Sequence, residues 1–411
     1  MIDTALLGLA QRHGTPLYVY DLAELRVRAG ELRAALPAAA RLLYSLKANP
    51  LPPVVAELRS AGLGAEVSSL GELDAAIEAG FAAAEVLYTG PGKSRPELEA
   101  AVGRGVRLLS CESSVELRRL HEVATAGRQP LRVLLRLQPA DRPASGLSMA
   151  DGRQFGFDLP TAVRACEQAR DTTVSIEGFH VYLGSQLGTV PALLAGFGHA
   201  RAAIAEVCAA TGVRPRIVDL GGGFPWPYAE PGTGCALDGL REGLADLLAD
   251  WAGDDGPELW FETGRRVVAA AGQLLSSVLD VKDRPDGAVV VLDAGINVLG
   301  GMSGLGRVMR PSTRFANLSA LDPAQAREHR QVSAAVVGPL CTPLDRLAAR
   351  TSIDTPRVGD VLRVSNVGGY GLTASLTSFL SRPAPPEVVV DGDRLVGSWQ
   401  LTSHRQVVPL E

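Results

Sequence analysis

Between residues 40 and 264, one pattern recurs eight times: a short apolar strand, a turn, and then a helical stretch rich in Ala, Leu, Glu and Arg. The expected strands are LLYSL from 42, AEVSS from 65, VLYTG from 86, RLLSC from 107, RVLLRL from 132, GFHVYLG from 178, IVDLGGG from 217 and LWFETG from 259. Strands that alternate with helices form parallel βαβ units. Eight such units predict a closed (β/α)8 barrel, with an open doubly wound sheet as the alternative.

After about residue 265 the pattern changes. Segments such as AVVVLDAGINV, DVLRVSNVG and PEVVVDGDRLVG are rich in valine and are broken by Gly and Asp, and they lack long helical stretches. They predict an antiparallel β domain. The early segment TPLYVYD is also strand-like and can pair with that domain. We therefore expect a barrel over residues 24–265 and a β domain formed by residues 1–23 and 266–411.

The composition argues against several classes of protein. A chain of 411 residues with 46% hydrophobic and 21% charged residues is typical of a globular protein, and its net charge of -5 gives no basis for nucleic-acid binding. We expect no membrane span, because no apolar stretch looks long enough to cross a bilayer. The five cysteines form no CxxC motif and no basic signal region opens the chain, which predicts reduced thiols in the cytoplasm. The six histidines show no metal-binding spacing, so no metal site is expected.

Polar residues occur at the C-terminal ends of the expected barrel strands, where barrels carry their active sites. Lys47 follows the first strand, although lysine is among the residues least often buried. Gly221 to Gly223 follow the seventh strand, and Glu262 and Arg265 come at the end of the eighth. Successive glycine N–H groups can hold an anion, and the loops after strands seven and eight often bind phosphate. The strands between them carry Glu66, Arg136, His180 and Tyr182.

Pyridoxal 5'-phosphate (PLP) accounts for this combination. Its aldehyde forms a Schiff base with a lysine, its phosphate needs anion donors, and its ring nitrogen needs a carboxylate to stay protonated. Lys47, Gly221 to Gly223 and Glu262 can fill these three roles. Simpler interpretations also exist: Lys47 can be a solvent-facing lysine, the glycine run a plain turn, and Arg136 an ion-pair partner inside the barrel with no substrate contact.

Nearly the whole chain resembles the fold-type III PLP-dependent decarboxylases, the ornithine and diaminopimelate decarboxylase family. The motifs that carry the resemblance are GTPLYVYD, YSLKANP, GAEVSSLGEL, HVYLGSQ, DLGGGFP, ETGR, GPLCTPLD and GGYG, in this order along the chain. The resemblance implies an N-terminal (β/α)8 barrel, a C-terminal β domain, and a homodimer whose active sites lie at the subunit interface.

The resemblance also implies roles for individual residues. Lys47 would hold the cofactor covalently, with the acidic Glu66 nearby, and Glu262 would pair with the ring nitrogen. Cys341 would reach across the dimer and return a proton after carbon dioxide leaves, and Asp345 follows it in the same loop. The expected cofactor-binding set is completed by Ser185, Gly222, Gly223, Gly264, Arg265 and Tyr370.

Three departures separate this chain from the family pattern. Tyr182 stands where the family has a histidine that stacks on the cofactor, and His180 lies two residues earlier and can compensate or merely pack nearby. Thr342 stands where an acidic residue usually recognises the distal amine of the substrate. The Arg-Pro-Ala-Leu-Tyr-like stretch of diaminopimelate decarboxylases is not recognisable. In its region stands NVLGGMSGLGRVMRPSTRF, which carries Arg307, Arg310 and Arg314.

These departures favour a PLP-dependent decarboxylase whose substrate is an amino acid attached to something larger, such as a glutamyl group on a carrier protein or a conjugated diamino acid. The candidate substrate contacts are Thr342, Asp345, Arg307 and Arg310. Three alternatives remain at this point: decarboxylation of free meso-diaminopimelate, racemisation with the same cofactor, and PLP binding without catalysis.

Overall fold

The computed structural model describes residues 3–139, 154–170, 172–182, 184–253, 255–285, 287–300, 313–322 and 330–407. The chain divides into two compact units. The barrel unit comprises Arg26–Trp226 and Gly234–Val267, and the β unit comprises Met1–Leu25, Pro227–Thr233 and Val268–Glu411. Each unit therefore combines segments that are far apart in the sequence.

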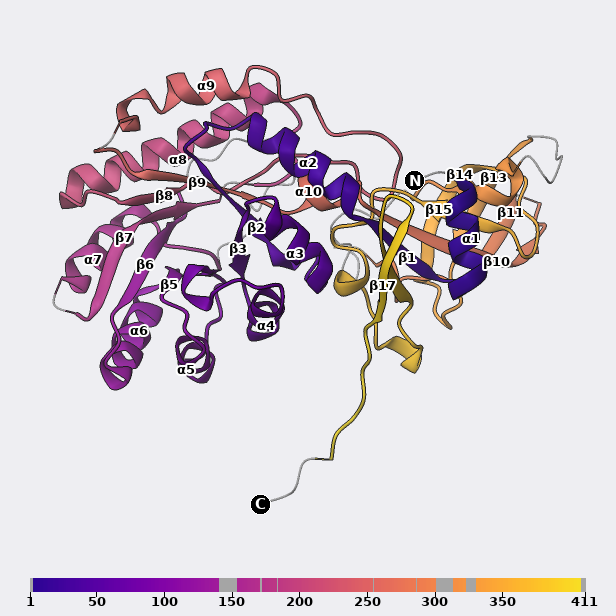
Figure 1. The fold of residues 1–411 in the computed structure, drawn as a ribbon, viewed down its shortest axis with the longest axis horizontal. Helices are drawn as coiled ribbons and strands as arrows, with labels where there is room; N and C mark the ends of the chain where they lie inside the picture. The colour runs from indigo at the N-terminus through magenta and orange to yellow at the C-terminus, as the bar shows by residue number, and fades with distance from the viewer. Residues whose placement is uncertain are drawn as a thin grey trace. The chain divides into compact units, whose positions relative to one another are not determined.

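The eight expected parallel strands close into a barrel, which confirms the predicted fold class and rules out the open sheet (Figure 1). The barrel strands are β2 (Arg41–Ser45), β3 (Gly64–Val67), β4 (Leu87–Tyr88), β5 (Leu108–Cys111), β6 (Leu131–Leu137), β7 (Val174–Val181), β8 (Ile217–Asp219) and β9 (Glu258–Thr263). All neighbouring pairs are parallel, and β2 pairs with β9 to complete the ring.

Helices surround these strands (Figure 1). They are α2 (Leu22–Ala34), α3 (Pro52–Ser60), α4 (Leu70–Glu78), α5 (Arg95–Gly103), α6 (Ser114–Gly127), α7 (Leu159–Ala169), α8 (Val190–Thr211), α9 (Leu240–Leu247) and α10 (Arg265–Val268). A Ser-x-x-Glu sequence starts three of them, and in each the serine hydroxyl accepts the N–H of that glutamate: Ser69 to Glu72, Ser94 to Glu97 and Ser113 to Glu116. These caps fix where each helix begins after its strand.

The helix α8 corrects one expectation. With 22 residues it is long and apolar enough, by length and composition, to cross a membrane. However, it is a shell helix of the barrel, and its residues Leu193, Phe197, Ile204 and Val207 are buried. An apolar helix of this kind is also what a buried position between a sheet and neighbouring helices requires.

The β unit contains a nine-stranded sheet and a short helix, α1 (Asp3–His13), that packs on it. Its strands are β1 (Leu17–Asp21), β10 (Gly272–Lys282), β11 (Ala288–Leu292), β12 (Ala316–Asn317), β13 (Gln331–Val337), β14 (Arg346–Asp354), β15 (Val361–Val364), β16 (Pro386–Asp391) and β17 (Arg394–Gln400), with α11 (Leu318–Leu321) after β12. As expected, the early strand β1 joins this sheet, between β10 and β16.

The sequence predicted an antiparallel β domain, but the sheet of the β unit is not purely antiparallel. The pairs β1–β16 and β11–β13 are parallel, so the sheet is mixed. Parallel neighbours need a long connection between them, and here the whole barrel separates β1 from β16. A valine-rich sequence broken by turns shows where the strands are. It does not show which distant strands pair with one another.

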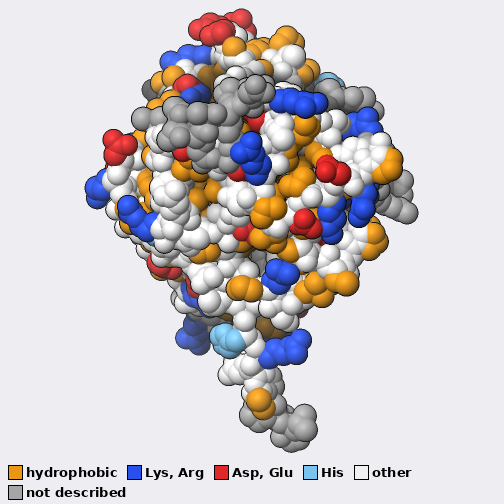
Figure 2. Space-filling view, turned by 90° about the vertical axis from the view of Figure 1, so that its right-hand side faces the viewer, with side chains coloured by type: hydrophobic (Ala, Val, Ile, Leu, Met, Phe, Trp, Pro, Cys, Tyr) orange, Lys and Arg blue, Asp and Glu red, His pale blue; other side chains and the backbone are white. Residues whose placement is uncertain are grey.

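The described part of the face in Figure 2 carries basic and acidic side chains interspersed with apolar ones. This mixed pattern agrees with a net charge of only -5 over 411 residues. No large field of one sign is visible on that part of the surface.

The buried Glu387 of β16 gives a pH dependence to the stability of the β unit. Its Oε1 accepts a hydrogen bond from the Tyr20 hydroxyl at 3.0 Å, and burial raises the pKa of Glu387 to about 7. Since the unfolded chain releases this proton near its ordinary pKa of 4.5, this group stabilises the fold below about pH 4.5 and that stability is lost as the pH rises to 7.

We expect Glu387→Gln to remove this dependence. One pKa unit corresponds to about 1.4 kcal/mol, so the wild type should lose on the order of 3 kcal/mol between pH 4.5 and 7.5 relative to the variant. Urea unfolding of both proteins across this range measures the difference. Parallel pH profiles for the two proteins would contradict the assignment.

Candidate active site

The inside of the barrel is apolar towards the N-terminal ends of the strands and polar towards their C-terminal ends. A core layer contains Leu43, Leu87, Leu108, Leu134, Ile217 and Trp260. Side chains two residues apart on a strand point to the same face, so the next inward residue of each strand lies one layer nearer its C-terminal end. At this next inward position each strand, or the residue directly after it, provides a polar side chain: Ser45, Glu66, Thr89, Ser110, Arg136, His180, Asp219 and Glu262. We call these eight residues the polar layer; none is more than 9% exposed. The apolar and polar sets overlap in height, because Glu262 pairs with Leu43 and Asp219 with Trp260.

Lys47 lies just beyond this layer. It follows β2 in a single 3-10 turn, Leu46–Ala48, and its side chain is 46% exposed. Its Nζ lies 3.3 and 3.4 Å from the two carboxylate oxygens of Glu66, which is 2% exposed. Glu66 in turn accepts a 2.6 Å hydrogen bond from the Thr89 hydroxyl. The polar layer therefore holds the lysine amine at the barrel mouth while leaving it accessible.

Three buried groups meet beside this lysine. One atom each of His180, Asp219 and Glu262 lies within 4.8 Å of the others. The His180 Nε2 is 3.4 Å from Glu262 Oε1, and neither atom makes a hydrogen bond with any described residue. The same holds for Asp219 Oδ2. Buried polar atoms without partners are rare, so this cluster is built for a group that supplies the missing partner.

The electrostatics of the cluster favour a cationic partner. Burial, and then the charges of Glu66 and Asp219, raise the pKa of Glu262 well above its ordinary value. Burial also raises the pKa of Asp219 to about 7, and burial together with the cations of Arg136 and Lys47 lowers the pKa of His180 well below 6.5. A protonated nitrogen placed against Glu262 would offset this excess of carboxyl groups.

The glycine run after β8 presents two free backbone donors. The N–H of Gly221 donates to Asp219 Oδ1, whereas those of Gly222 and Gly223 donate to no described protein oxygen. A Cβ on Gly222 would lie 2.4 Å from the Glu262 carbonyl oxygen, and Gly223 has φ of +110°. Only glycine fits here, and the resulting loop can approach an anion closely.

Arg136 has a structural partner, as its simpler interpretation predicted. Its Nη1 lies 3.0 Å from Glu112 Oε1, and its guanidinium lies over the Phe155 ring at 4.6 Å. The second oxygen of Glu112 accepts the N–H of Gly156 at 3.2 Å. Arg136 and Glu112 therefore hold the segment that contains Phe155 and Gly156 against the barrel. Arg136 also adds positive charge near His180.

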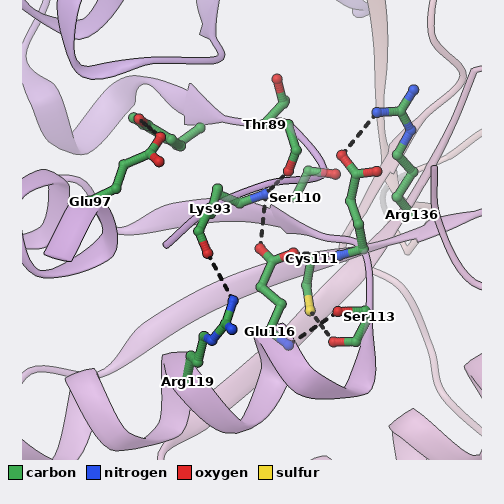
Figure 3. A network of polar contacts seen from close by, with 12 residues as sticks. Thr89, Lys93, Glu97, Ser110, Cys111, Ser113, Glu116, Arg119 and Arg136 are labelled. Atoms are coloured by element: carbon green, nitrogen blue, oxygen red, sulfur yellow. Dashed lines mark hydrogen bonds and ion pairs between the residues drawn. The ribbon is translucent and has the colours of Figure 1, made fainter. Parts of the chain in front are cut away.

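Next to this contact lies a buried ion pair that the sequence did not predict. Lys93 Nζ is 2.8 Å from Glu116 Oε1, and the two side chains are 1% and 4% exposed (Figure 3). Lys93 also donates to the Gly90 carbonyl, and its own carbonyl accepts from Arg119. The pair joins the loop before α5 to the first turn of α6.

Breaking this pair should destabilise the barrel strongly. We expect Glu116→Leu to lower the free energy of unfolding by about 3–5 kcal/mol, because it leaves a buried ammonium without its partner. The double variant Lys93→Met/Glu116→Leu should recover most of this loss, since no charge then remains buried. Urea unfolding compares the two. A single variant as stable as the wild type would refute the importance of the pair.

The other residues singled out from the sequence fall into two groups. Tyr182, Ser185, Gly264 and Arg265 belong to the barrel unit and are all partly exposed near the ends of β7 and β9. The β unit contains Cys341, Thr342, Asp345 and Tyr370. Arg307 and Arg310 lie outside the described residues.

Sequence reasoning missed the supporting members of the polar layer. Ser110 Oγ lies 2.8 Å from His180 Nδ1, and Thr89 holds Glu66. Each follows an apolar inward residue by two positions, and this spacing is the signal that could have identified them. A lone serine or threonine at a strand end carries no other mark of function.

Comparisons with known proteins agree with this geometry. The family model for the pyridoxal binding domain of pyridoxal-dependent decarboxylases matches residues 22–269. The L-glutamyl-(BtrI acyl-carrier protein) decarboxylase of Niallia circulans is 31% identical over 403 residues, which cover 96% of this chain and 92% of that protein. Diaminopimelate decarboxylase of Zymomonas mobilis is 31% identical over 409 residues, with coverages of 95% and 91%.

A solved structure supports the fold. Diaminopimelate decarboxylase from M. jannaschii superimposes with a TM-score of 0.83 at 24% identity, covering 95% of this chain and 90% of that one. The polar layer fits the cofactor of this family, because PLP brings a phosphate, an aldehyde and a ring nitrogen that takes up a proton. The cluster around Glu262 thus needs no metal ion to explain it. The chain belongs to the fold-type III pyridoxal-dependent decarboxylases and is a PLP-dependent carboxy-lyase.

Proposed function

We propose that this enzyme removes the α-carboxylate of an amino acid that is attached to a larger group, such as a glutamyl group on a carrier protein. The observation that carries this proposal is the loop Leu340–Asp345. Thr342, in place of the usual acid, offers a neutral hydroxyl whose Oγ1 accepts the N–H of Leu344 at 3.3 Å. The loop thus presents no acid at this position to a substrate ammonium.

The only carboxylate of this loop is already engaged. Asp345 is 3% exposed and accepts the N–H groups of Ile296 at 2.8 Å and Leu340 at 2.7 Å. A Cβ on Gly295 or Gly338 would lie 2.4 Å from its oxygens, so both glycines leave room for it. Asp345 therefore shapes the loop that carries Cys341. A free diamino acid would find no charged partner in the loop for its distal amine.

We assign the remaining roles as follows. Lys47 binds the cofactor aldehyde, and Glu66 orients its amine. The N–H groups of Gly222 and Gly223, with Ser185, Gly264, Arg265 and Tyr370, hold the phosphate, and Tyr182 packs on the ring. Bound PLP supplies the electron sink for the bond that releases carbon dioxide. Glu262 keeps a proton at the ring nitrogen, and the exposed Cys341 of a second copy returns a proton to the α-carbon.

Two further expectations accompany this proposal. The enzyme works as a homodimer with shared active sites, an expectation that rests on the resemblance of the chain to its family. It acts in the cytoplasm, where its five cysteines stay reduced; all five are free thiols in the structure.

The test is carbon dioxide release by the PLP-loaded protein from glutamyl-loaded carrier protein and, in parallel, from free meso-diaminopimelate. Lys47→Ala provides the blank. Release from the tethered substrate alone supports the proposal. Release from the free diamino acid would replace it with the second candidate, diaminopimelate decarboxylase, which the 31% identity to the Zymomonas mobilis enzyme favours equally.

A single substitution should shift this preference. We expect Thr342→Glu to raise kcat/KM for free meso-diaminopimelate about tenfold or more, because it restores an anion for the distal amine. Thr342→Gln, which has the same length without the charge, is the matched control and should gain nothing. Equal rates for both variants would exclude an electrostatic role for this position.

A further inference from the structure

The residues Ser110, His180 and Glu262 form a line across the top of the barrel. They come from β5, β7 and β9, so no local sequence pattern joins them. Ser110 is 0%, His180 2% and Glu262 3% exposed. Their contacts are Ser110 Oγ to His180 Nδ1 at 2.8 Å and His180 Nε2 to Glu262 Oε1 at 3.4 Å.

The direction of the hydrogen bond between Ser110 and His180 depends on which nitrogen of the His180 ring carries the proton. Charged groups act on His180 from five places in the barrel: Lys47 after β2, Lys93 before α5, Arg136 on β6, Asp219 on β8 and Glu262 on β9. Burial and the three cations lower the pKa of His180 and so keep the ring neutral, with a proton on only one ring nitrogen. If the serine hydroxyl donates to Nδ1, the proton must be on Nε2, which then faces an oxygen of Glu262.

We propose that His180 is a positioning residue for Glu262: Ser110 holds its ring in the Nε2–H form, and Nε2–H donates to Glu262 Oε1 in the PLP-loaded enzyme. This rests on the proposed role of Glu262 at the ring nitrogen. The second carboxylate oxygen is then left to face the ring. Apo active sites often show such hydrogen bonds as long contacts that tighten in the loaded enzyme, which accounts for the 3.4 Å.

The arrangement has a physical purpose. A carboxylate buried among other acids tends to keep its own proton, and then it cannot favour a protonated ring. A neutral donor at Oε1 stabilises the ionised form of Glu262 without adding a positive charge that would compete for the ring nitrogen. Because Tyr182 is the residue proposed to pack on the cofactor ring, His180 is not needed there and can face Glu262.

The first experiment reads the tautomer directly. The protein is labelled with nitrogen-15 in its six histidines, loaded with PLP, and studied by long-range proton–nitrogen NMR between pH 6 and 9. His180→Gln identifies the His180 signals by their loss. A neutral ring protonated at Nε2 throughout this range is expected. A ring protonated at Nδ1, or an imidazolium at pH 7, overturns the proposal.

The second experiment reads the cofactor. PLP labelled with nitrogen-15 in its ring should show a protonated nitrogen in the wild type and a shift toward the unprotonated form in His180→Phe. PLP affinity should fall about tenfold, the lower end of what loss of a partner that orients a ligand costs at metal sites. His180→Gln, which keeps an N–H donor, should retain part of the ring-nitrogen protonation and part of the PLP affinity. An unchanged ring-nitrogen signal in His180→Phe with PLP bound overturns the proposal.

A control variant tests whether loss of any buried hydroxyl would have the same effect. The behaviour of the wild type then separates failure of the proposed function from failure of the role of His180. Thr211→Val removes another buried hydroxyl of the barrel unit, bound to the Val207 carbonyl on α8, and should leave the ring-nitrogen signal unchanged. If the wild type does not bind PLP, the proposed function itself fails. If it binds PLP and releases carbon dioxide but His180 shows the wrong tautomer, only the role of His180 fails.

Discussion

Borohydride reduction of the PLP-loaded enzyme should fix the cofactor on Lys47 alone, and Lys47→Ala should lower kcat on the order of 10⁴-fold or more, because no other amine can take its place. The chain has only three lysines, Lys47, Lys93 and Lys282. Lys93 is 1% exposed and paired with Glu116, and Lys282 lies on β10 of the β unit. Lys47 is the one that combines a barrel-mouth position with an accessible amine.

Peptide mapping after reduction measures this directly, and the visible absorbance of the bound cofactor gives a second readout. Lys282→Ala, an exposed lysine with its side chain 47% accessible, is the matched control and should behave as the wild type. Labelling of Lys282 or Lys93, or a fully active Lys47→Ala protein, would show that the covalent site has been misplaced.

Glu262→Gln should lower kcat by about 10²–10³-fold while PLP remains bound through Lys47. A neutral amide cannot keep a proton on the ring nitrogen, so the ring loses its power to accept electrons from the departing carboxylate. The loss should therefore appear mainly in kcat, with a smaller effect on KM. Steady-state kinetics together with the nitrogen-15 signal of labelled PLP test both parts.

A second glutamate on the same strand gives the control. Glu258 lies at the N-terminal end of β9 and is exposed, so Glu258→Gln should change neither kcat nor the ring-nitrogen signal. Glu262→Asp, which keeps the charge on a shorter side chain, should recover part of the lost activity. If Glu262→Gln retained wild-type kcat, another group would have to protonate the ring.

The sequence predicted the framework well because its signals are local. Eight alternations of strand and helix specified the barrel, since parallel strands joined by helices can close in few ways. Lys47, the glycine run and Glu262 could be found because strand ends share one edge of a barrel. The parallel pairs β1–β16 and β11–β13 could not be predicted, because each pair joins segments that are far apart in the sequence and no local pattern indicates the pairing.

The tertiary structure alone decided how the strand-end residues act on one another. Ser110, His180 and Glu262 come from three strands, and only the barrel register puts them in line. The shifts that raise the pKa of Glu262 and lower that of His180 come from burial and from charges on other strands, which no single segment contains. Similarly, the sequence names Asp345 only as a candidate substrate contact, and the fold alone shows that its carboxylate accepts two backbone N–H groups. The sequence by itself thus predicted the barrel and its cofactor, because strand order and residue type favour both, and the closed barrel then ruled out the open sheet. The protonation and orientation of the site depend on distances between strands, which exist only after folding.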